Sequence, residues 1–260
     1  MTFDAVPSPG VEFPDAFNLA DYFLFDRVRE GKGGNTAIRF GDRTWTYAQV
    51  ATRSRALARW LVAHGLAPEQ RVYVVLPDVP PFAWAIFATL AAGGILTMGN
   101  PVAPPDDLGY VLEYVKAAVL ITTPEVAETL APRLARLSHL RMVLLVPSVA
   151  TGEDPETKVP LGVRTGALVM PSRHAVSVHV ASLNVAIEAA AAEPSIVATT
   201  LPAVRRDDPA IWLFTSGSTG RPKAAMHSHR DFAFNTEVYA KRTVGYRMRD
   251  VTVKIGRAHV

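Results

Sequence analysis

The chain has 260 residues, of which 49% are hydrophobic and 20% are charged, and its formal net charge is +3. This composition excludes an intrinsically disordered chain and is typical of one or two globular domains with a sizeable core. The charges are mixed along the sequence, and no basic stripe with interleaved aromatic residues is visible, which argues against nucleic-acid binding.

Cysteine is absent from the sequence, which excludes disulfides and thiolate metal sites and favours a reducing compartment. The first 17 residues are acidic and interrupted by proline, whereas a signal peptide begins with basic and then apolar residues. No apolar run approaches the roughly 18 residues of a membrane span. We therefore expect a cytoplasmic protein without a membrane span.

The first quarter of the chain mixes helix and hairpin patterns. Residues 1–17 have the composition of an irregular lead-in, and Asn18 is a plausible cap for a helix that follows it. The glycine-rich residues 31–35 favour a plain turn over a phosphate loop, because no strand precedes them. The pattern then predicts a hairpin of residues 36–40 and 43–46, followed by an amphipathic helix over residues 47–64.

From Arg71 onward, short apolar runs alternate with segments of helix length. This alternation predicts parallel strands joined by right-handed helical crossovers, and hence a layered α/β fold around a parallel sheet. The predicted strands are residues 72–76, 95–98, 118–122 and 142–146, and the predicted helices are residues 80–92, 106–116 and 124–137.

The alternation is lost over residues 147–181, where proline, glycine, threonine and charged residues dominate before two weak strand candidates at 167–170 and 176–180. We interpret this region as a variable surface excursion. An alanine-rich helix over residues 183–192 and a polar connection over residues 193–209 then lead to an apolar strand at 210–214.

The most informative stretch is TSGSTGRPK, residues 215–223, between that strand and a second extended candidate at 224–227. Glycines let backbone N–H groups turn toward a ligand, hydroxyls donate to phosphate oxygens, and lysine adds positive charge. The spacing fits neither the Walker A pattern nor the dinucleotide fingerprint. A flexible polar hairpin loop is the alternative, and the ordered sequence of strand, loop and second apolar run argues against it.

These nine residues resemble the phosphate loop of the adenylate-forming, or AMP-binding, superfamily, which includes acyl- and aryl-CoA synthetases, peptide-synthetase adenylation domains and luciferases. Residues 44–50 and 88–100 are similar to two further motifs of that superfamily, in the same order and spacing. The resemblance covers residues 18–254 apart from the excursion, and it implies the large N-terminal adenylation domain. Within the superfamily, residues 17–22, 208–214 and 235–242 look most like benzoate-CoA and related aryl-CoA ligases, although an ordinary amphipathic helix explains residues 235–242 equally well.

The resemblance implies that a carboxylic acid, expected to be aromatic, is activated by ATP with Mg²⁺ and then transferred to CoA. An adenylation domain that loads a carrier protein and a nucleotide-binding chain without turnover are the alternatives. The ATP phosphates would be bound by seven residues of the loop: Thr215, Ser216, Gly217, Ser218, Thr219, Gly220 and Lys223.

His227 and His229 follow the loop at a spacing of two residues, and Asp231 continues the spacing. Three side chains at this spacing share one face only on a strand, whereas residues 232–234 favour the start of a helix, so we assign no metal site here. The resemblance implies that one of the two histidines lies near the nucleotide and acyl pocket, without indicating which one.

The resemblance also implies a Tyr-Gly-x-Thr-Glu stretch whose glutamate meets magnesium, an aspartate that binds the ribose, and a small C-terminal domain with the adenylation lysine. None has a counterpart in this sequence, and Lys223 belongs to the loop, so the catalytic residues are unassigned. Residues 255–260, IGRAHV, match one reading frame of a common sequencing adapter. We therefore expect a non-native tail on an N-terminal fragment that is inactive by itself.

Overall fold

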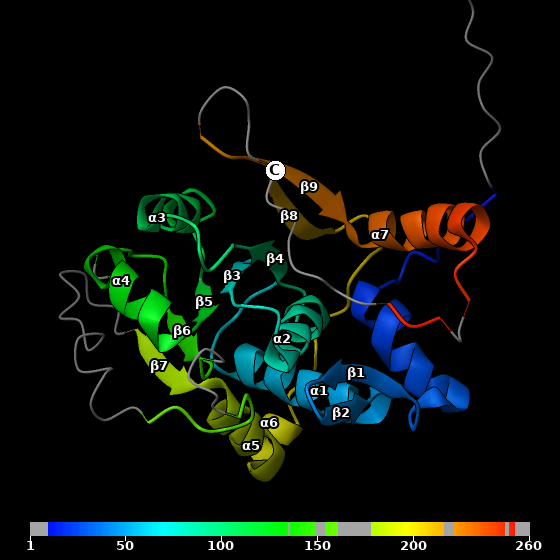
Figure 1. Ribbon diagram of the computed structural model, residues 1–260, viewed down its shortest axis with the longest axis horizontal. Helices are drawn as coiled ribbons and strands as arrows, with labels where there is room; N and C mark the ends of the chain where they lie inside the picture. Colours follow the sequence, from blue (N-terminus) through cyan, green and yellow to red (C-terminus); the bar gives the residue numbers. More distant parts are fainter. Residues whose placement is uncertain are drawn as a thin grey trace, which may run out of the picture.

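The computed structural model describes residues 10–134, 136–148, 154–160, 178–215, 221–247 and 250–252 (Figure 1). The strand candidate at 167–170, the loop residues 216–220 and the proposed tail 255–260 therefore lie outside the described residues. Within the described ranges, no helix is both long and apolar enough to cross a membrane.

The N-terminal region contains two short π-helical segments and a hairpin, whose strands pair antiparallel as the sequence predicts. Asn18 acts as the expected local cap, because its Oδ1 accepts a hydrogen bond from the Ala20 N–H at 2.8 Å. Gly31 adopts a φ of 79°, in the left-handed region that favours glycine, so the chain turns there as predicted. The elements are η1 (Asp21–Phe25), η2 (Val28–Lys32), β1 (Thr36–Phe40) and β2 (Arg43–Thr46).

Helix α1 (Tyr47–Ala63) begins and ends for local reasons that the sequence contains. A capping box closes its first turn: the Gln49 N–H donates to Thr46 Oγ1 at 3.2 Å, and Gln49 Oε1 accepts from the Thr46 N–H at 2.8 Å. The helix stops just before Gly65, whose φ of 91° no helical residue can adopt. This confirms the helix predicted over residues 47–64 to within one residue.

The described residues form a seven-stranded sheet in the order β7-β6-β5-β3-β4-β8-β9. All neighbouring pairs are parallel except β8 and β9, so the predicted parallel sheet over residues 71–146 is confirmed. The strands are β3 (Arg71–Val75), β4 (Ile95–Met98), β5 (Val119–Thr122), β6 (Met142–Leu145), β7 (His179–Ser182), β8 (Pro209–Thr215) and β9 (Lys223–Ser228).

Helices cover both faces of the sheet, which is why its central strands are almost uniformly apolar (Figure 1). One face packs against α1, α2 (Pro80–Ala91), α5 (Leu183–Ala192) and α6 (Pro194–Val197). The other packs against α3 (Pro105–Tyr114) and α4 (Pro124–Leu134). Strand β8 divides its side chains between them: Ile211 and Leu213 lie on the α1–α2 face, and Trp212 and Phe214 on the α3–α4 face.

The small residues between α2 and β4 are required by close packing. Gly93 has a φ of 69°, and a Cβ on Gly94 would lie 3.3 Å from the Gln70 carbonyl oxygen. A Cβ on Gly99 would overlap the ring of Tyr73, which is buried on β3. The motif at residues 88–100 is therefore rich in small side chains because two turns and a buried ring leave no room for larger ones.

Most of residues 147–181 lie outside the described residues, so their interpretation as a surface excursion stays a prediction, whereas the described end of the region belongs to the sheet. Their C-terminal end forms strand β7, which pairs parallel with β6. β7 overlaps the weak candidate at 176–180, but it begins three residues later and ends two residues later. Glu156 is also tied to the helical layer, because its carboxylate accepts from Trp45 Nε1 at 3.1 Å and pairs with Arg53. The sequence of β7, HVAS, has polar residues at both ends and lacks the continuous apolar run that marks β5 and β6.

Two smaller differences have clear physical reasons. Helix α3 ends at Tyr114, before the predicted end at residue 116, because Lys116 adopts a left-handed φ of 49°. The polar connection at residues 193–209 contains the short helix α6, which begins with Pro194 at its first position and buries Ile196.

Candidate functional site

The loop predicted to bind phosphate joins β8 to β9 at the carboxyl edge of the parallel strands. Strand β8 runs parallel to β4, with Leu96 opposite Ile211, and it ends at Thr215. Strand β9 returns antiparallel, so that Lys223 lies directly opposite Thr215. In open α/β sheets, ligands bind at this edge, beyond the carboxyl ends of the strands.

Two of the seven residues predicted to bind phosphate are described, and the hairpin brings them together. Thr215 and Lys223 are both exposed, and their pairing places the two Cα atoms about 5 Å apart. The other five, Ser216, Gly217, Ser218, Thr219 and Gly220, lie outside the described residues. Their contact with phosphate therefore stays a prediction.

His227 lies on β9, four residues from Lys223, which corresponds to about 13 Å along the strand. Its imidazole packs edge-to-face on Phe232, with ring centroids 5.2 Å apart, and its Nδ1 lies 3.8 Å from Asp231 Oδ2. One third of its side chain is exposed, so His227 is the accessible member of the histidine pair.

His229 occupies a different environment as the first residue of α7 (His229–Asn235). It is 1% exposed, and its Nδ1 accepts a hydrogen bond from the Leu19 N–H at 3.0 Å. Burial lowers the pKa of His229 to about 4, although the Asp208 carboxylate opposes the shift. His229 therefore joins the helix after the loop to the N-terminal helix, and sequence reasoning missed this role because its partner lies 210 residues away.

The two histidines and Asp231 do not share one strand face, because the chain changes from strand to helix between them. Ser228 caps α7, and its N–H donates to Asp231 Oδ2 at 2.8 Å. This confirms the helix start favoured by residues 232–234. Across the described ranges, no group of three or more His, Cys, Asp or Glu side chains could hold a metal ion.

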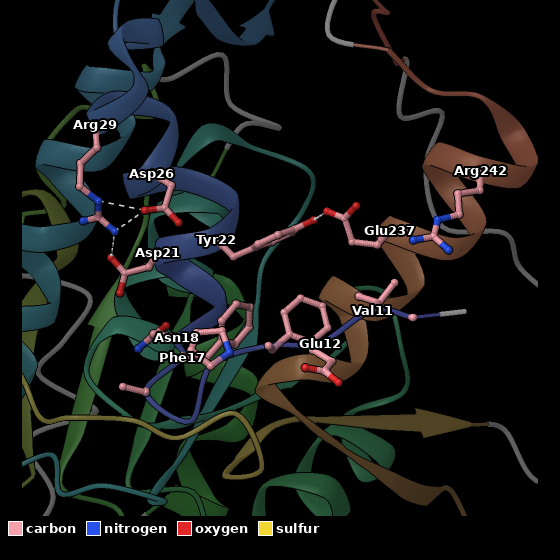
Figure 2. Close-up of a pocket in the computed structure, with 14 residues that line it drawn as sticks. Val11, Glu12, Phe17, Asn18, Asp21, Tyr22, Asp26, Arg29, Glu237 and Arg242 are labelled. Carbon is pink, nitrogen blue, oxygen red and sulfur yellow. Dashed lines mark hydrogen bonds and ion pairs between the residues drawn. The ribbon is translucent and has the colours of Figure 1, made fainter. Parts of the chain in front are cut away.

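A cavity of about 680 Å³ lies between the N-terminal segment and η5 (Thr236–Val244), the π-helical continuation of α7 (Figure 2). Figure 2 shows Tyr22 and Glu237 pointing toward each other across it, and the Tyr22 hydroxyl donates a hydrogen bond to Glu237 Oε1. Burial, reinforced by the Glu237 carboxylate, raises the pKa of Tyr22 far above its ordinary value.

The charges around this cavity are mainly negative. Asp21 and Asp26 pair with Arg29 at 2.7 and 2.5 Å, and Arg242 is the second arginine of the lining. The four carboxylates that line the cavity belong to Glu12, Asp21, Asp26 and Glu237. Four carboxylates against two guanidinium groups make this cavity a poor site for a carboxylate substrate.

The stretches that look like aryl-CoA ligases are brought together in this part of the molecule. The Tyr22–Glu237 hydrogen bond joins residues 17–22 to residues 235–242. The Asp208 carbonyl, at the start of residues 208–214, accepts from the His229 N–H at 3.1 Å. Residues 235–242 therefore contact the N-terminal segment through Glu237 and Lys241, which both meet Tyr22.

Comparison with known proteins gives one matching family model, described as AMP-binding enzyme, over residues 25–255. Among curated relatives, the benzoate–CoA ligase of Thauera aromatica is 28% identical over 94% of this chain and 40% of its own length. The 4-hydroxybenzoate–CoA/benzoate–CoA ligase of Rhodopseudomonas palustris is 27% identical over 90% of this chain and 38% of its own length. The chain thus spans about 40% of the length of these relatives.

The fold is also found in a solved structure, that of the anthranilate CoA ligase AuaEII in complex with anthranoyl-AMP. The match has a TM-score of 0.70 at 22% identity, and it covers 90% of this chain and 39% of the other. The predicted fold class is therefore confirmed as that of the N-terminal domain of adenylate-forming enzymes.

Proposed function

Because the chain belongs to the family of AMP-binding enzymes, we propose that it takes part in the ATP-dependent activation of a carboxylic acid as its acyl-adenylate. The observation that carries this proposal is the β8–β9 hairpin. It brings Thr215 and Lys223, the first and last residues of TSGSTGRPK, opposite each other at the carboxyl edge of the sheet. A loop of hydroxyl, glycine and lysine residues at that edge is suited to phosphate.

The reaction has two displacement steps. A carboxylate oxygen of the acid attacks the α-phosphorus of ATP, and the bond to the pyrophosphate oxygen breaks, which gives acyl-AMP and pyrophosphate. The CoA sulfur then attacks the acyl carbon, the bond to the AMP oxygen breaks, and the thiol proton is lost. Catalysis of the first step depends on positioning and on stabilisation of phosphate charge.

In this scheme, the residues of the loop hold the leaving pyrophosphate. Backbone N–H groups near Gly217 and Gly220, the hydroxyls of Thr215 and Ser218, and the Lys223 ammonium are donors with no competing negative charge of their own. His227, one third exposed and on the same strand as Lys223, is the better of the two histidines for the nucleotide or acyl pocket. His229 is committed to the Leu19 N–H.

Magnesium accompanies ATP in phosphoryl chemistry of this kind. The described residues hold no group of three or more side chains that fits a metal ion. The chemistry proposed for the loop of this chain is that of hydroxyl, amide and ammonium donors.

An aromatic acid is the proposed substrate and CoA the proposed acceptor. The names of the relatives from Thauera and Rhodopseudomonas support both. The second candidate function is that of an adenylation domain that loads a carrier protein. Transfer of the acyl group to a carrier thiol in place of CoA would identify it.

The test is to add ATP at millimolar concentration to the 260-residue chain and to measure the amide hydrogen exchange of residues 214–223 with and without it. We expect ATP to slow the exchange of these amides, and AMP to slow it less, because the loop is proposed to bind the β- and γ-phosphates. Gly217→Val should abolish the protection by blocking backbone approach. Gly34→Val is the matched control, because Gly34 is exposed, has an ordinary φ and has no atom within 4 Å of an added Cβ. Equal protection in both variants would contradict the loop's role.

The same chain, given ATP, magnesium, CoA and a panel of aryl and acyl acids, should form no measurable AMP. The ribose, magnesium and lysine contacts implied by the family resemblance have no counterpart in this sequence, and loss of one preorganised donor commonly costs about 10²–10³-fold. Turnover at the rate of an ordinary ligase would contradict this expectation.

A further inference from the structure

Four side chains form a continuous column on the α3–α4 face of the sheet, and we call it the aromatic column. Its members in order are Phe214, Tyr114, Tyr110 and Arg221. The Tyr114 and Phe214 rings meet edge-to-face with centroids 5.9 Å apart, and the Tyr110 and Tyr114 rings are 5.7 Å apart. The Arg221 guanidinium carbon lies 4.9 Å from the centroid of the Tyr110 ring.

The column touches the chain on both sides of the proposed phosphate loop. Phe214 immediately precedes Thr215, and Arg221 immediately follows Gly220. Both contacts are made by a single helix, because Tyr110 and Tyr114 are four residues apart and so lie on one face of α3. One helix turn therefore contacts the chain on both sides of the loop, through two side chains about 6 Å apart along the helix axis.

Helix α3 is firmly held by the rest of the molecule. Its opposite face buries Leu108, Val111 and Leu112 against the sheet and α4. Arg133 of α4 pairs with Asp106 and, at 3.4 Å, with Glu113, which fixes the solvent side of the same helix. Tyr110 and Tyr114 thus belong to a helix whose opposite face is buried and whose solvent side is ion-paired.

The electrostatic surroundings also favour Arg221 at this position. A cavity of about 350 Å³ beside it is lined by the carboxylates of Asp106, Asp107 and Glu113, with Arg133 as the balancing cation. A cation stacked on a tyrosine ring beside three carboxylates is attracted by both the ring and the charges.

We propose that Tyr110 and Tyr114 are positioning residues that hold the two ends of the phosphate loop in a fixed orientation relative to α3. Tyr114 holds the β8 end through Phe214, and Tyr110 holds the β9 end through Arg221. The contacts stand on the geometry above, whereas their consequence for ATP rests on the proposed function. Neither tyrosine touches the reacting atoms.

The first experiment needs no nucleotide. Amide hydrogen exchange of residues 214–223 is measured in the 260-residue chain and in Tyr110→Leu. Loss of an exposed cation–π contact should raise the exchange rate of this segment about two- to fivefold. Exchange in β6 should be unchanged, because it reports global stability. Tyr239→Leu is the matched control, since Tyr239 is 59% exposed on η5 and outside the column.

Two further variants separate positioning from a general packing defect. Tyr110→Phe keeps the ring face and should exchange like the original chain. Tyr110→Leu introduced into Arg221→Met should raise the exchange rate by less than it does in the original chain, because the cation–π partner is already absent. The proposal is overturned if Tyr110→Leu leaves the segment unchanged, if Tyr110→Phe is as fast as Tyr110→Leu, or if the two substitutions add independently.

The second experiment adds ATP. Tyr110→Leu should weaken ATP binding by the same two- to fivefold and Tyr110→Phe should not. Tyr110→Leu could speed the exchange of residues 214–223 while ATP gives the original chain no protection. That result would support the positioning role of Tyr110 and contradict the phosphate-binding role of the loop. If ATP protects both chains equally, the loop's function stands and the positioning role of Tyr110 fails.

Discussion

Strands β5 and β6 and the β8–β9 hairpin belong to one sheet, yet their surroundings differ sharply. All four residues of β5 and all four of β6 are buried, because helices cover both faces. In β9, three of six residues are exposed, and Met226 is 63% exposed. The centre of the sheet is thus built for stability, and its hairpin edge keeps side chains and backbone accessible to a ligand.

The largest expected difference between the two regions is the cost of removing a side chain. Leu120→Ala on β5 should lower the free energy of unfolding by about 2–5 kcal/mol, because Leu120 is fully buried. Met226→Ala on β9 should change it by less than about 0.5 kcal/mol. Urea unfolding of both variants measures the difference, and similar losses would show that the hairpin edge is as tightly packed as the centre.

The pH dependence of stability should report on His229, which is buried where the segment after the hairpin meets Leu19. The folded-state pKa of His229 is about 4, below its ordinary value of 6.5, so the unfolded chain binds the proton first as pH falls. The contribution of His229 is fully present above pH 6.5 and is lost as pH falls toward 4. Between pH 7.5 and 5 the loss should be about 2 kcal/mol.

His229→Asn is the matched variant for this measurement. Its Oδ1 can accept the Leu19 N–H in place of Nδ1 but does not titrate in this range. The variant should therefore be less stable than the original chain at pH 7.5 and show a flatter pH dependence. Parallel curves for the two chains would mean that His229 is not the group responsible.

The smallest expected difference between the two regions is the loss of stability on removing a helix cap. Thr46→Ala removes the capping box of the 17-residue helix α1 and should cost about 1 kcal/mol of global stability. Ser228→Ala removes the same device from the seven-residue helix α7, which has fewer helical hydrogen bonds to lose than α1, so the global loss should be smaller than for Thr46→Ala. Faster amide exchange confined to α7 would confirm that distinction, and an equal global loss would contradict it.

Most of the central fold follows from local sequence patterns. Short apolar runs such as residues 142–146 and the capping box at Thr46 predict their elements because the physical cause lies within a few residues. The edge strand β7 was predicted only as the weak candidate at 176–180, because its sequence HVAS has no continuous apolar run, and the single-turn helix α6 was not predicted.

Some features of the candidate site could likewise be predicted from the sequence, and others could not. The phosphate loop is recognisable because all its chemistry lies in nine consecutive residues. The role of His229 and the contact of Tyr110 with Arg221 were invisible, because each joins residues more than one hundred positions apart. Such pairs are specified by the tertiary fold, and a single sequence does not contain them.

The hydrogen bond between Leu19 and His229 has a consequence for synthesis on the ribosome. Its two partners are 210 residues apart, which at 5–20 residues per second corresponds to about 10–40 s of translation. Leu19, Leu24 and Phe25, which the finished chain buries, remain without the β9–α7 segment during that interval. This contact can therefore form only after the hairpin that carries the phosphate loop has been synthesised.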